Sequence, residues 1–214
     1  MTPEEQAIVD QFHRLYYDGP RGEGRVHHRT SSMRTPGLKC PLDLWAYQEI
    51  FAEVRPDLVV ETGTHMGGSA LFFAQMLDLL GRGEVITIDI VEDKTRPRHP
   101  RIRYVTGSSA DASLIGSLLG SRSPETRLVV LDSDHRKAHV LRELEILAPY
   151  VDVGSYVIVE DTNVNGHPVL PDFGPGPSEA IAEFLAGDRG FEVDESRQKF
   201  LMTFNPGGFL KRIR

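Results

Sequence analysis

The chain has 214 residues, enough for one well-buried domain, and its 40% hydrophobic and 26% charged residues are ordinary for a soluble globular protein. Its formal net charge of -7 at pH 7 argues against a general nucleic-acid binder, because such proteins need a basic face to neutralise phosphates. The single cysteine excludes an internal disulfide, and no run approaches the roughly 20 apolar residues of a membrane span. We therefore expect a cytoplasmic protein without a membrane span.

The part of the chain up to residue 40 is expected to form a cap on the main domain. Residues 3–17 place Ile8, Phe12 and Leu15 on one face of a predicted helix, which we expect outside the main core as a lid or partner surface. Residues 18–39 are rich in Gly, Arg, His and Ser with little periodicity and predict an irregular arm. The apolar helix face indicates a possible homo-oligomer.

From residue 41 to residue 214, apolar runs of strand length alternate with helical patterns. The predicted strands cover residues 57–61, 84–89, 101–106, 127–132 and 155–160. The predicted helices cover residues 41–54, 110–119, 135–148 and 178–186, with one more that ends near Leu80. Strands separated by helices indicate right-handed crossovers, so we expect an α/β fold with a mainly parallel sheet covered on both faces. Two further strands, residues 191–193 and 200–204, should close the chain as an antiparallel hairpin.

The connection between the predicted strand at residues 57–61 and the helix that follows it is rich in glycine. Glu61 ends the strand, Gly63 and Gly67 follow, and His65 stands where the dinucleotide-binding fingerprint has its second glycine. The acid before the glycines also suits a cationic ligand better than a pyrophosphate. The spacing E-x-G-x-x-x-G resembles the loop of S-adenosylmethionine (SAM)-dependent methyltransferases, and it disfavours the alternative of an NAD-dependent oxidoreductase.

Acidic residues follow four of the predicted strands, at the edge where open α/β sheets bind their ligands. They are Glu61, Asp89, Asp132, Asp134, Glu160 and Asp161. Six carboxylates at one edge repel each other unless cations, donors or a metal ion offset them. Asp89, about 28 residues beyond Glu61, is placed to accept hydrogen bonds from both hydroxyls of a ribose.

Three of these acids, Asp134, Glu160 and Asp161, form the predicted metal site. Carboxylates without a cysteine suit a hard divalent ion, and Mg²⁺ is the favoured candidate because it keeps open positions for water and substrate. The alternative interpretation is a pair of solvated acids at the end of a strand.

Some motifs resemble the catechol-type O-methyltransferases. The segment Asp134-His135-Arg136-Lys137, followed by Glu160-Asp161, resembles their metal and catalytic segment, and Gly107-Ser108-Ser109-Ala110-Asp111 resembles their adenine loop. Arg136 replaces the aromatic residue of those enzymes, which argues against a catechol substrate.

A closer resemblance, to the cephalosporin hydroxylase/rhamnosyl O-methyltransferase family, covers nearly the whole chain from Leu38. The similar segments are Leu38-Lys39-Cys40-Pro41-Leu42-Asp43-Leu44-Trp45, Val60-Glu61-Thr62-Gly63-Thr64, Gly67-Gly68-Ser69, Ser133-Asp134-His135, Val159-Glu160-Asp161-Thr162 and Phe173-Gly174-Pro175-Gly176-Pro177. The resemblance implies a Rossmann-like class I methyltransferase fold with a mostly parallel seven-stranded sheet, SAM as cofactor, and Mg²⁺ held by Asp134, Glu160 and Asp161. The candidate cofactor-binding residues are Glu61, Gly63, Thr64, Gly67, Ser69, Asp89, Ser109, Asp132 and His135.

The expected reaction is the transfer of a methyl group from SAM to a hydroxyl of a small molecule, and the resemblance favours a sugar or a glycosylated natural product. Lys137 is the matching candidate for the general base, with His135 and His167 as alternatives. Residues 162–177 are the expected acceptor lid. The family name includes a hydroxylase, but the sequence does not support that activity here, because it has no 2-His-1-carboxylate spacing for iron and His139 is expected on a solvated face. A catalytically silent SAM-binding partner protein is the other alternative.

Overall fold

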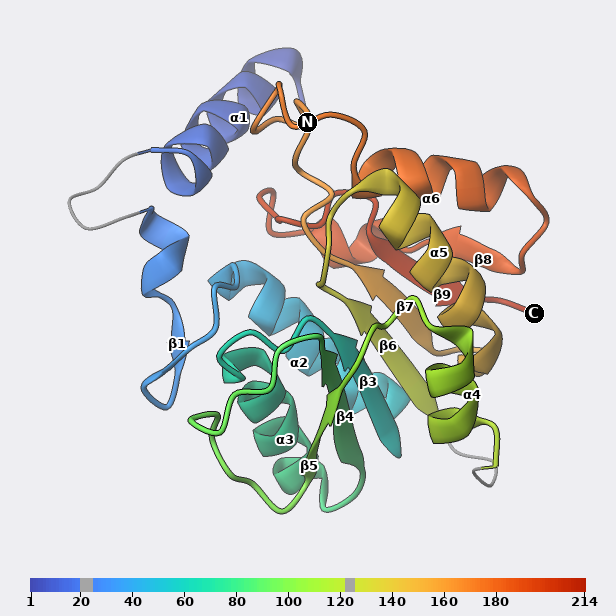
Figure 1. Cartoon of the computed structure of the whole chain (residues 1–214). Helices are drawn as coiled ribbons and strands as arrows, with labels where there is room; N and C mark the ends of the chain where they lie inside the picture. Colours follow the sequence, from blue (N-terminus) through green and yellow to red (C-terminus); the bar gives the residue numbers. More distant parts are fainter. Residues whose placement is uncertain (20–24, 122–125) are drawn as a thin grey trace.

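The computed structural model describes residues 1–19, 25–121 and 126–214, so residues 20–24 of the predicted arm lie outside the described residues. Its centre is a seven-stranded sheet with the strand order β5-β4-β3-β6-β7-β9-β8 (Figure 1). The strands are β3 (Leu58–Thr62), β4 (Glu84–Asp89), β5 (Ile102–Thr106), β6 (Arg127–Leu131), β7 (Tyr156–Val159), β8 (Phe191–Val193) and β9 (Phe209–Arg212). The first five of these strands are parallel, which confirms the predicted fold class.

Helices cover both faces of the sheet, because alternate residues of its buried strands point to opposite sides. The helices are α2 (Pro41–Val54), α3 (Gly68–Leu80), α4 (Ala112–Leu119), α5 (Lys137–Leu147) and α6 (Pro177–Ala186), with a short 3₁₀ turn η2 (Ala148–Tyr150) after α5. Val59 packs with apolar residues of α2 and α3, whereas Val60 packs with those of α4, α5 and α6. Both valines are fully buried, so the central strand contributes to two separate hydrophobic layers.

The strand order reverses between β3 and β6. From β3 the chain continues to β4 and β5 on one side, while β6 and β7 extend the sheet on the other side. The two central strands end together, since Thr62 pairs with Leu131. In open α/β sheets this reversal opens a crevice beyond the carboxyl ends of the strands, where ligands bind.

The antiparallel end of the sheet differs from the prediction in one strand. β8 pairs with β9 as expected for a C-terminal antiparallel pair, with Phe191 opposite Arg212. The prediction of a strand at residues 200–204 was wrong: after the 3₁₀ turn η3 (Glu195–Gln198), these residues form bends and turns. Phe204 is buried with Tyr17 of the N-terminal helix, so its apolar character serves packing and not strand pairing.

The N-terminal helix α1 (Pro3–Tyr17) lies at one end of the molecule, beside the loop that follows β7 (Figure 1). It begins with a capping box, in which Thr2 and Glu5 exchange backbone-to-side-chain hydrogen bonds. It is anchored through His13 and Tyr17, while Ile8 and Phe12 are exposed. The arm continues through η1 (Val26–Arg29), β1 (Ser31–Ser32) and β2 (Thr35–Pro36).

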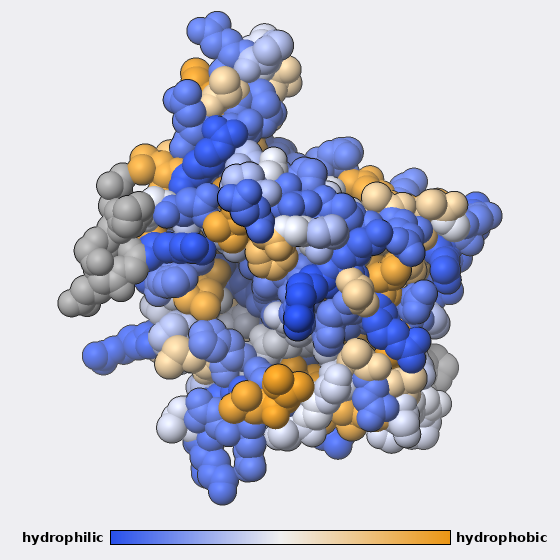
Figure 2. All heavy atoms as spheres, turned by 45° about the horizontal axis from the view of Figure 1, so that its top comes forward, coloured by the Kyte–Doolittle hydropathy of each residue, from blue (hydrophilic) through white to orange (hydrophobic). Residues whose placement is uncertain are grey.

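Over the described residues, no helix is both long enough and apolar enough to cross a membrane. Figure 2 shows a face that is mainly hydrophilic, on which hydrophobic residues form small separate groups.

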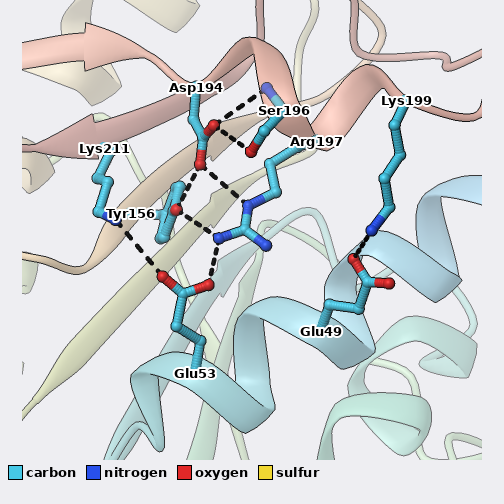
Figure 3. A network of polar contacts seen from close by, with 8 residues as sticks. All are labelled: Glu49, Glu53, Tyr156, Asp194, Ser196, Arg197, Lys199 and Lys211. Atoms are coloured by element: carbon cyan, nitrogen blue, oxygen red, sulfur yellow. Dashed lines mark hydrogen bonds and ion pairs between the residues drawn. The ribbon is translucent and has the colours of Figure 1, made fainter.

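A polar network joins α2 to the C-terminal segment (Figure 3). The Tyr156 hydroxyl donates to Asp194 Oδ2 at 2.6 Å, and Arg197 Nε donates to the same oxygen at 3.0 Å. Arg197 also pairs with Glu53 of α2. The network therefore ties the start of β7, η3 and α2 together.

Candidate active site

A cavity of about 710 Å³ opens at the carboxyl ends of β3, β4, β6 and β7, where the strand order reverses. The N-terminal arm closes one side of it, through His27 and residues 36–38. Of the residues predicted from the sequence, the lining includes Gly63, Thr64, Ser69, Asp89, Ser109, Asp132, Asp134, His135, Glu160 and Asp161. Glu61, Gly67 and Lys137 are not part of the lining.

The glycine loop fits between the end of β6 and the arm. Gly63 has a φ of +82°, and a Cβ atom there would lie 1.9 Å from the carbonyl oxygen of Asp132. At Gly68, the first residue of α3, a Cβ atom would lie 2.1 Å from the carbonyl oxygen of Pro36. Glycine is the residue that permits both close backbone approaches, so the loop holds the start of α3 against the cavity.

The acids at the ends of β3 and β4 have different surroundings. Glu61 is fully buried and accepts a hydrogen bond of 2.6 Å from Thr87. Burial raises the pKa of Glu61 to about 7, although the Lys39 cation acts in the opposite direction. Asp89 lines the cavity and accepts hydrogen bonds from the backbone N–H groups of His65 and Val91, at 2.8 and 2.9 Å. The Asp89 carboxylate therefore faces the cavity, whereas the Glu61 carboxylate is buried beneath the glycine loop.

Three side chains converge at the ends of β6 and β7. Asp132, His135 and Asp161 each offer one ligand atom within 4.8 Å of the others. His135 Nε2 lies 3.2 Å from Asp161 Oδ2 and 3.9 Å from Asp132 Oδ1. Burial raises the pKa of both carboxyl groups, even though the neighbouring His135 and Lys39 act in the opposite direction. The site thus gathers negative charge that favours a cation.

Glu160 makes different contacts from its neighbour Asp161. Glu160 Oε1 accepts a hydrogen bond of 2.5 Å from the Tyr47 hydroxyl, and Oε2 lies 2.5 Å from Lys39 Nζ. Lys39 Nζ also lies 2.5 Å from Asp132 Oδ2. The turn that separates the two acids is sharp, since Asp161 has a φ of +53°. Both acids line the cavity, and of the two only Asp161 is part of the cluster with Asp132 and His135.

Asp134 and Lys137 point to partners outside the three-residue cluster. Asp134 pairs with Arg136, whose hydrogen bonds lower the pKa of the Asp134 carboxyl to about 2. Lys137 Nζ lies 2.7 Å from Glu183 Oε2 and connects α5 to α6. Asp134 lines the same cavity, while the carboxylate of this segment that lies within the three-residue cluster is that of Asp132.

His139 and His167 also have surroundings other than those expected from the sequence. His139 was expected on a solvated face, but it lines the cavity, with Nε2 3.4 Å from Ser109 Oγ and 3.5 Å from Glu143 Oε1. The expectation was wrong because the first turns of α5 lie along the cavity wall. His167 pairs with Glu179 at 2.9 Å and is not part of the cavity lining.

Several residues near the site were missed from the sequence. Lys39 and Tyr47 contact Glu160, and Tyr17 of α1 forms a hydrogen bond with Asp161, which opposes the burial that raises the pKa of that carboxyl group. His27 stacks on Tyr17 with 4.5 Å between the ring centroids. No local sequence pattern indicates that Tyr17, His27 or Tyr47 contacts the site. For Lys39 the available indication was its position within the motif Leu38-Lys39-Cys40-Pro41.

Comparison with known proteins finds a matching family and close relatives. The family model described as Rhamnosyl O-methyltransferase/CmcI matches residues 25–213. The chain is 38% identical, over 214 residues, to the rhamnosyl O-methyltransferase of Mycobacterium tuberculosis (strain ATCC 25618 / H37Rv), with 96% of this chain and 85% of the relative covered. It is 39% identical, over 215 residues, to the rhamnosyl O-methyltransferase of Mycobacterium leprae (strain TN), with 96% and 91% covered.

Solved structures are similar in fold. The structure described as cmcI-D160 Mg-SAM superposes with a TM-score of 0.64 at 21% identity, and the match covers 91% of this chain and 82% of that one. MycE methyltransferase, from the mycinamycin biosynthetic pathway and in complex with Mg, SAH (S-adenosylhomocysteine) and mycinamycin VI, has a TM-score of 0.52 at 25% identity. That match covers 65% of this chain and 41% of the MycE chain.

Proposed function

Because the chain belongs to the rhamnosyl O-methyltransferase/CmcI family, we propose that it is a SAM- and Mg²⁺-dependent O-methyltransferase acting on a sugar or glycosylated natural product. The observation that carries this proposal is that one cavity faces both the glycine loop after β3 and the Asp132–His135–Asp161 cluster. The mycobacterial relatives bear the name rhamnosyl O-methyltransferase, and the CmcI and MycE structures contain Mg with SAM or SAH.

The cofactor fits the loops at the ends of β3, β4, β5 and β6. SAM supplies, when bound, the methyl group on its sulfonium. Asp89 can accept from a ribose hydroxyl through Oδ1, which has a second lone pair beyond its hydrogen bond from Val91, whereas Oδ2 is shared by the His65 N–H and Arg96. The negative charge of Asp132 at the other end of the cavity suits the cationic end of the cofactor. The residues assigned to the cofactor are Glu61, Gly63, Thr64, Gly67, Ser69, Asp89, Ser109, Asp132 and His135.

The carboxylates beside His135 fit a hard divalent ion. Asp132 and Asp161 offer oxygens, which Mg²⁺ prefers to nitrogen, so these two are our proposed direct ligands. Mg²⁺ supplies, when bound, positive charge that lowers the pKa of an acceptor hydroxyl. Asp134 and Glu160, the other candidates from the sequence, are held by Arg136 and Lys39, and we propose that they shape the charge of the site.

His135 is our proposed general base. A neutral imidazole nitrogen can take the proton that the acceptor hydroxyl loses, and His135 Nε2 lies between the Asp132 and Asp161 carboxylates, which stabilise the protonated ring. Lys137, the candidate from the sequence, stays as the alternative. It would have to leave its ion pair with Glu183 to reach the cavity.

The acceptor enters between the arm and the loop that follows β7. Val164 and Val169 of that loop pack with Tyr17 of α1, so the expected lid, residues 162–177, and the N-terminal arm form one surface beside Asp161. Variation of this surface would change the acceptor without changing the chemistry at the cluster.

We further propose a cytoplasmic protein that acts on small molecules and not on nucleic acid, in keeping with its single cysteine and its negative charge. Residues 1–40 would form the cap of the methyltransferase domain, residues 41–214. The exposed side chains of Ile8, Phe12 and Leu15 offer an apolar face for contact between copies of the chain.

Calorimetric titration of the purified protein with SAH and with NAD⁺ tests the cofactor assignment. We expect SAH to bind with micromolar or better affinity and NAD⁺ not to bind. Binding of NAD⁺ alone would favour the oxidoreductase alternative. A screen of rhamnosylated and other glycosylated acceptors with SAM and Mg²⁺ then separates an active enzyme from a silent SAM-binding protein.

A further inference from the structure

Arg96 places a buried positive charge in the cavity wall, on the connection between β4 and β5. It is part of the cavity lining, and its side chain is only 5% exposed. Burying a charged group is costly unless the group is paired and hydrogen-bonded. The partners of Arg96 therefore indicate what the buried charge does.

These partners belong to the two loops that we assign to the cofactor. Arg96 Nη2 lies 3.1 Å from Asp89 Oδ2 at the end of β4, and Arg96 Nε donates to the carbonyl oxygen of His65 at 2.8 Å. The same oxygen of Asp89 accepts a hydrogen bond of 2.8 Å from the backbone N–H of His65. Both backbone polar groups of His65 are therefore held, the N–H by Asp89 and the C=O by Arg96.

The glycine loop has a strained backbone that these contacts support. His65 has a φ of +46°, in the left-handed region that side chains rarely adopt. Two residues away, a Cβ atom at Gly67 would lie 3.1 Å from Pro97 and from the Tyr104 hydroxyl, which itself donates to the Pro97 carbonyl oxygen at 2.7 Å. The segment around Arg96 is thus packed directly against the loop between β3 and α3.

An arginine near the acid after a strand can also accommodate the 2′-phosphate of NADP. Here the guanidinium already contacts a carboxylate and a carbonyl oxygen of the protein. Asp89 Oδ1 has one hydrogen bond, from the Val91 N–H, and keeps a lone pair for a ribose hydroxyl. These contacts favour a role in shaping a ribose site over a role in binding phosphate.

We propose that Arg96 is a positioning residue for the methyl donor: it fixes Asp89 and His65 relative to each other, so that Asp89 presents Oδ1 to the ribose of SAM. This inference rests on the proposed function, because it concerns the ribose site of the cofactor. Arg96 acts through Asp89 and takes no part in methyl transfer.

The test is calorimetric titration with SAH and with the SAH analogue that lacks both ribose hydroxyls. In Arg96→Met, SAH should bind roughly tenfold or more weakly, because Asp89 loses a charged donor and the loop loses a contact. The analogue cannot donate to Asp89, so its affinity should fall less and the ratio of the two affinities should shrink. Arg101→Met is the matched control: Arg101 pairs with Asp78 outside the cavity lining, and its loss should change neither affinity.

A double-mutant cycle shows whether Arg96 acts through Asp89. Asp89→Asn should weaken SAH binding, and the further change Arg96→Met should weaken it little more, because the carboxylate that Arg96 positions is already gone. Circular dichroism establishes that each variant is folded. If Arg96→Met does not fold, then Arg96→Lys, which keeps the charge but lacks the planar fork of donors, takes its place with the same expected direction.

The two proposals fail in different ways. A folded Arg96 variant that binds SAH as tightly as wild type, or that loses the same factor for SAH and for the analogue, would overturn the role of Arg96. Fully additive losses in the double-mutant cycle would overturn it too. Failure of the wild-type protein to bind SAH would instead overturn the proposed cofactor.

Discussion

At the scale of single residues, the chemistry depends on where neighbouring acids point. Asp161 adopts a left-handed backbone conformation directly after β7, which turns its carboxylate toward His135 and Tyr17. Glu160, one position earlier, points to Lys39 and Tyr47. Two successive carboxylates thus have different partners, and of the two only Asp161 is part of the cluster with Asp132 and His135.

Replacing Asp161 by Asn should separate metal binding from cofactor binding. The amide keeps the size of the side chain but removes its charge, so we expect turnover to fall by roughly a hundredfold or more and Mg²⁺ affinity to fall with it. SAH affinity should stay near the wild-type value. Asp134→Asn is the control, because Asp134 is paired with Arg136. If Asp134→Asn alone abolishes Mg²⁺ binding, then the assignment of the ligands from the structure is wrong.

The general base can be identified by comparing two variants. His135→Gln should lower kcat by about 10²- to 10⁴-fold, because the proton of the acceptor hydroxyl loses its receiving nitrogen. Lys137→Met should have a much smaller effect, since Lys137 pairs with Glu183 outside the cavity lining. Single-turnover methyl transfer at saturating SAM measures both. The opposite order of effects would restore Lys137 as the base.

The sequence indicated the segment that carries the site but not which residues in it converge. The run from Asp132 to Lys137 was recognisable, yet Arg136 is two residues from Asp134 and pairs with it, which leaves Asp132 to face the cavity centre. Lys39 could not be found in this way, because it reaches Asp132 across 93 positions of the chain through the fold of the arm.

At the scale of elements, the loop between β3 and α3 is the segment that we propose holds the cofactor. Gly63→Ala would place a methyl group 1.9 Å from the Asp132 carbonyl oxygen at a φ of +82°. We expect SAH affinity to fall by roughly tenfold or more and the melting temperature to fall, because the loop must move. Gly116→Ala is the control: the glycine is in helix α4 with nothing within 4 Å of the added methyl. That variant should be neutral or more stable by up to about 1 kcal/mol, and wild-type SAH affinity in Gly63→Ala would contradict the account.

The network around Tyr156 gives a prediction for stability and its dependence on pH. Tyr156→Phe removes the hydroxyl that donates to Asp194, so the free energy of unfolding should fall by about 1–3 kcal/mol (Figure 3). Burial opposes ionisation of Asp194, but hydrogen bonds from Ser196 and Tyr156 and the Arg197 cation outweigh it and lower the pKa to about 2. A lowered carboxyl pKa stabilises the fold above the ordinary value of 3.8 and ceases to do so as the pH falls toward 2.

The difference in free energy of unfolding between wild type and Tyr156→Phe should therefore shrink as the pH falls through this range. Urea denaturation at a series of pH values measures it. A difference that stays constant with pH would show that the Tyr156 hydroxyl does not interact with the ionised form of Asp194.

Periodicity predicted most elements because burial determined their pattern. Four of the parallel strands, β3, β4, β6 and β7, are largely apolar runs buried between helices on both faces, whereas β5 is a half-exposed edge strand; the structure places all five close to where the sequence analysis did. Residues 200–204 are also mainly apolar, but Met202 and Phe204 are buried in a cluster with Tyr17 of α1, Val164 and Val169, and Leu201 is exposed. An apolar pattern of five residues cannot distinguish a strand from a loop that packs against a separate helix.

At the scale of the whole molecule, the active site is assembled from distant parts of the chain. The arm supplies His27 and Lys39, the sheet supplies the acids at its strand ends, and the loop after β7 closes the acceptor side. In the proposed function, the methyl donor would lie over the central strands and the acceptor beside Asp161. The methyltransferase fold can therefore be common to the relatives of this chain, while the acceptor site depends on the arm and on the loop after β7.

The most direct test of this account is methyl transfer from isotopically labelled SAM to a rhamnosylated acceptor, measured with Mg²⁺, after EDTA treatment, and after Mg²⁺ is restored. We expect label on a sugar hydroxyl oxygen with Mg²⁺, loss of transfer with EDTA, and recovery on restoring the ion. Transfer that is equally fast after complete removal of divalent ions would contradict the proposed role of the Asp132–His135–Asp161 cluster.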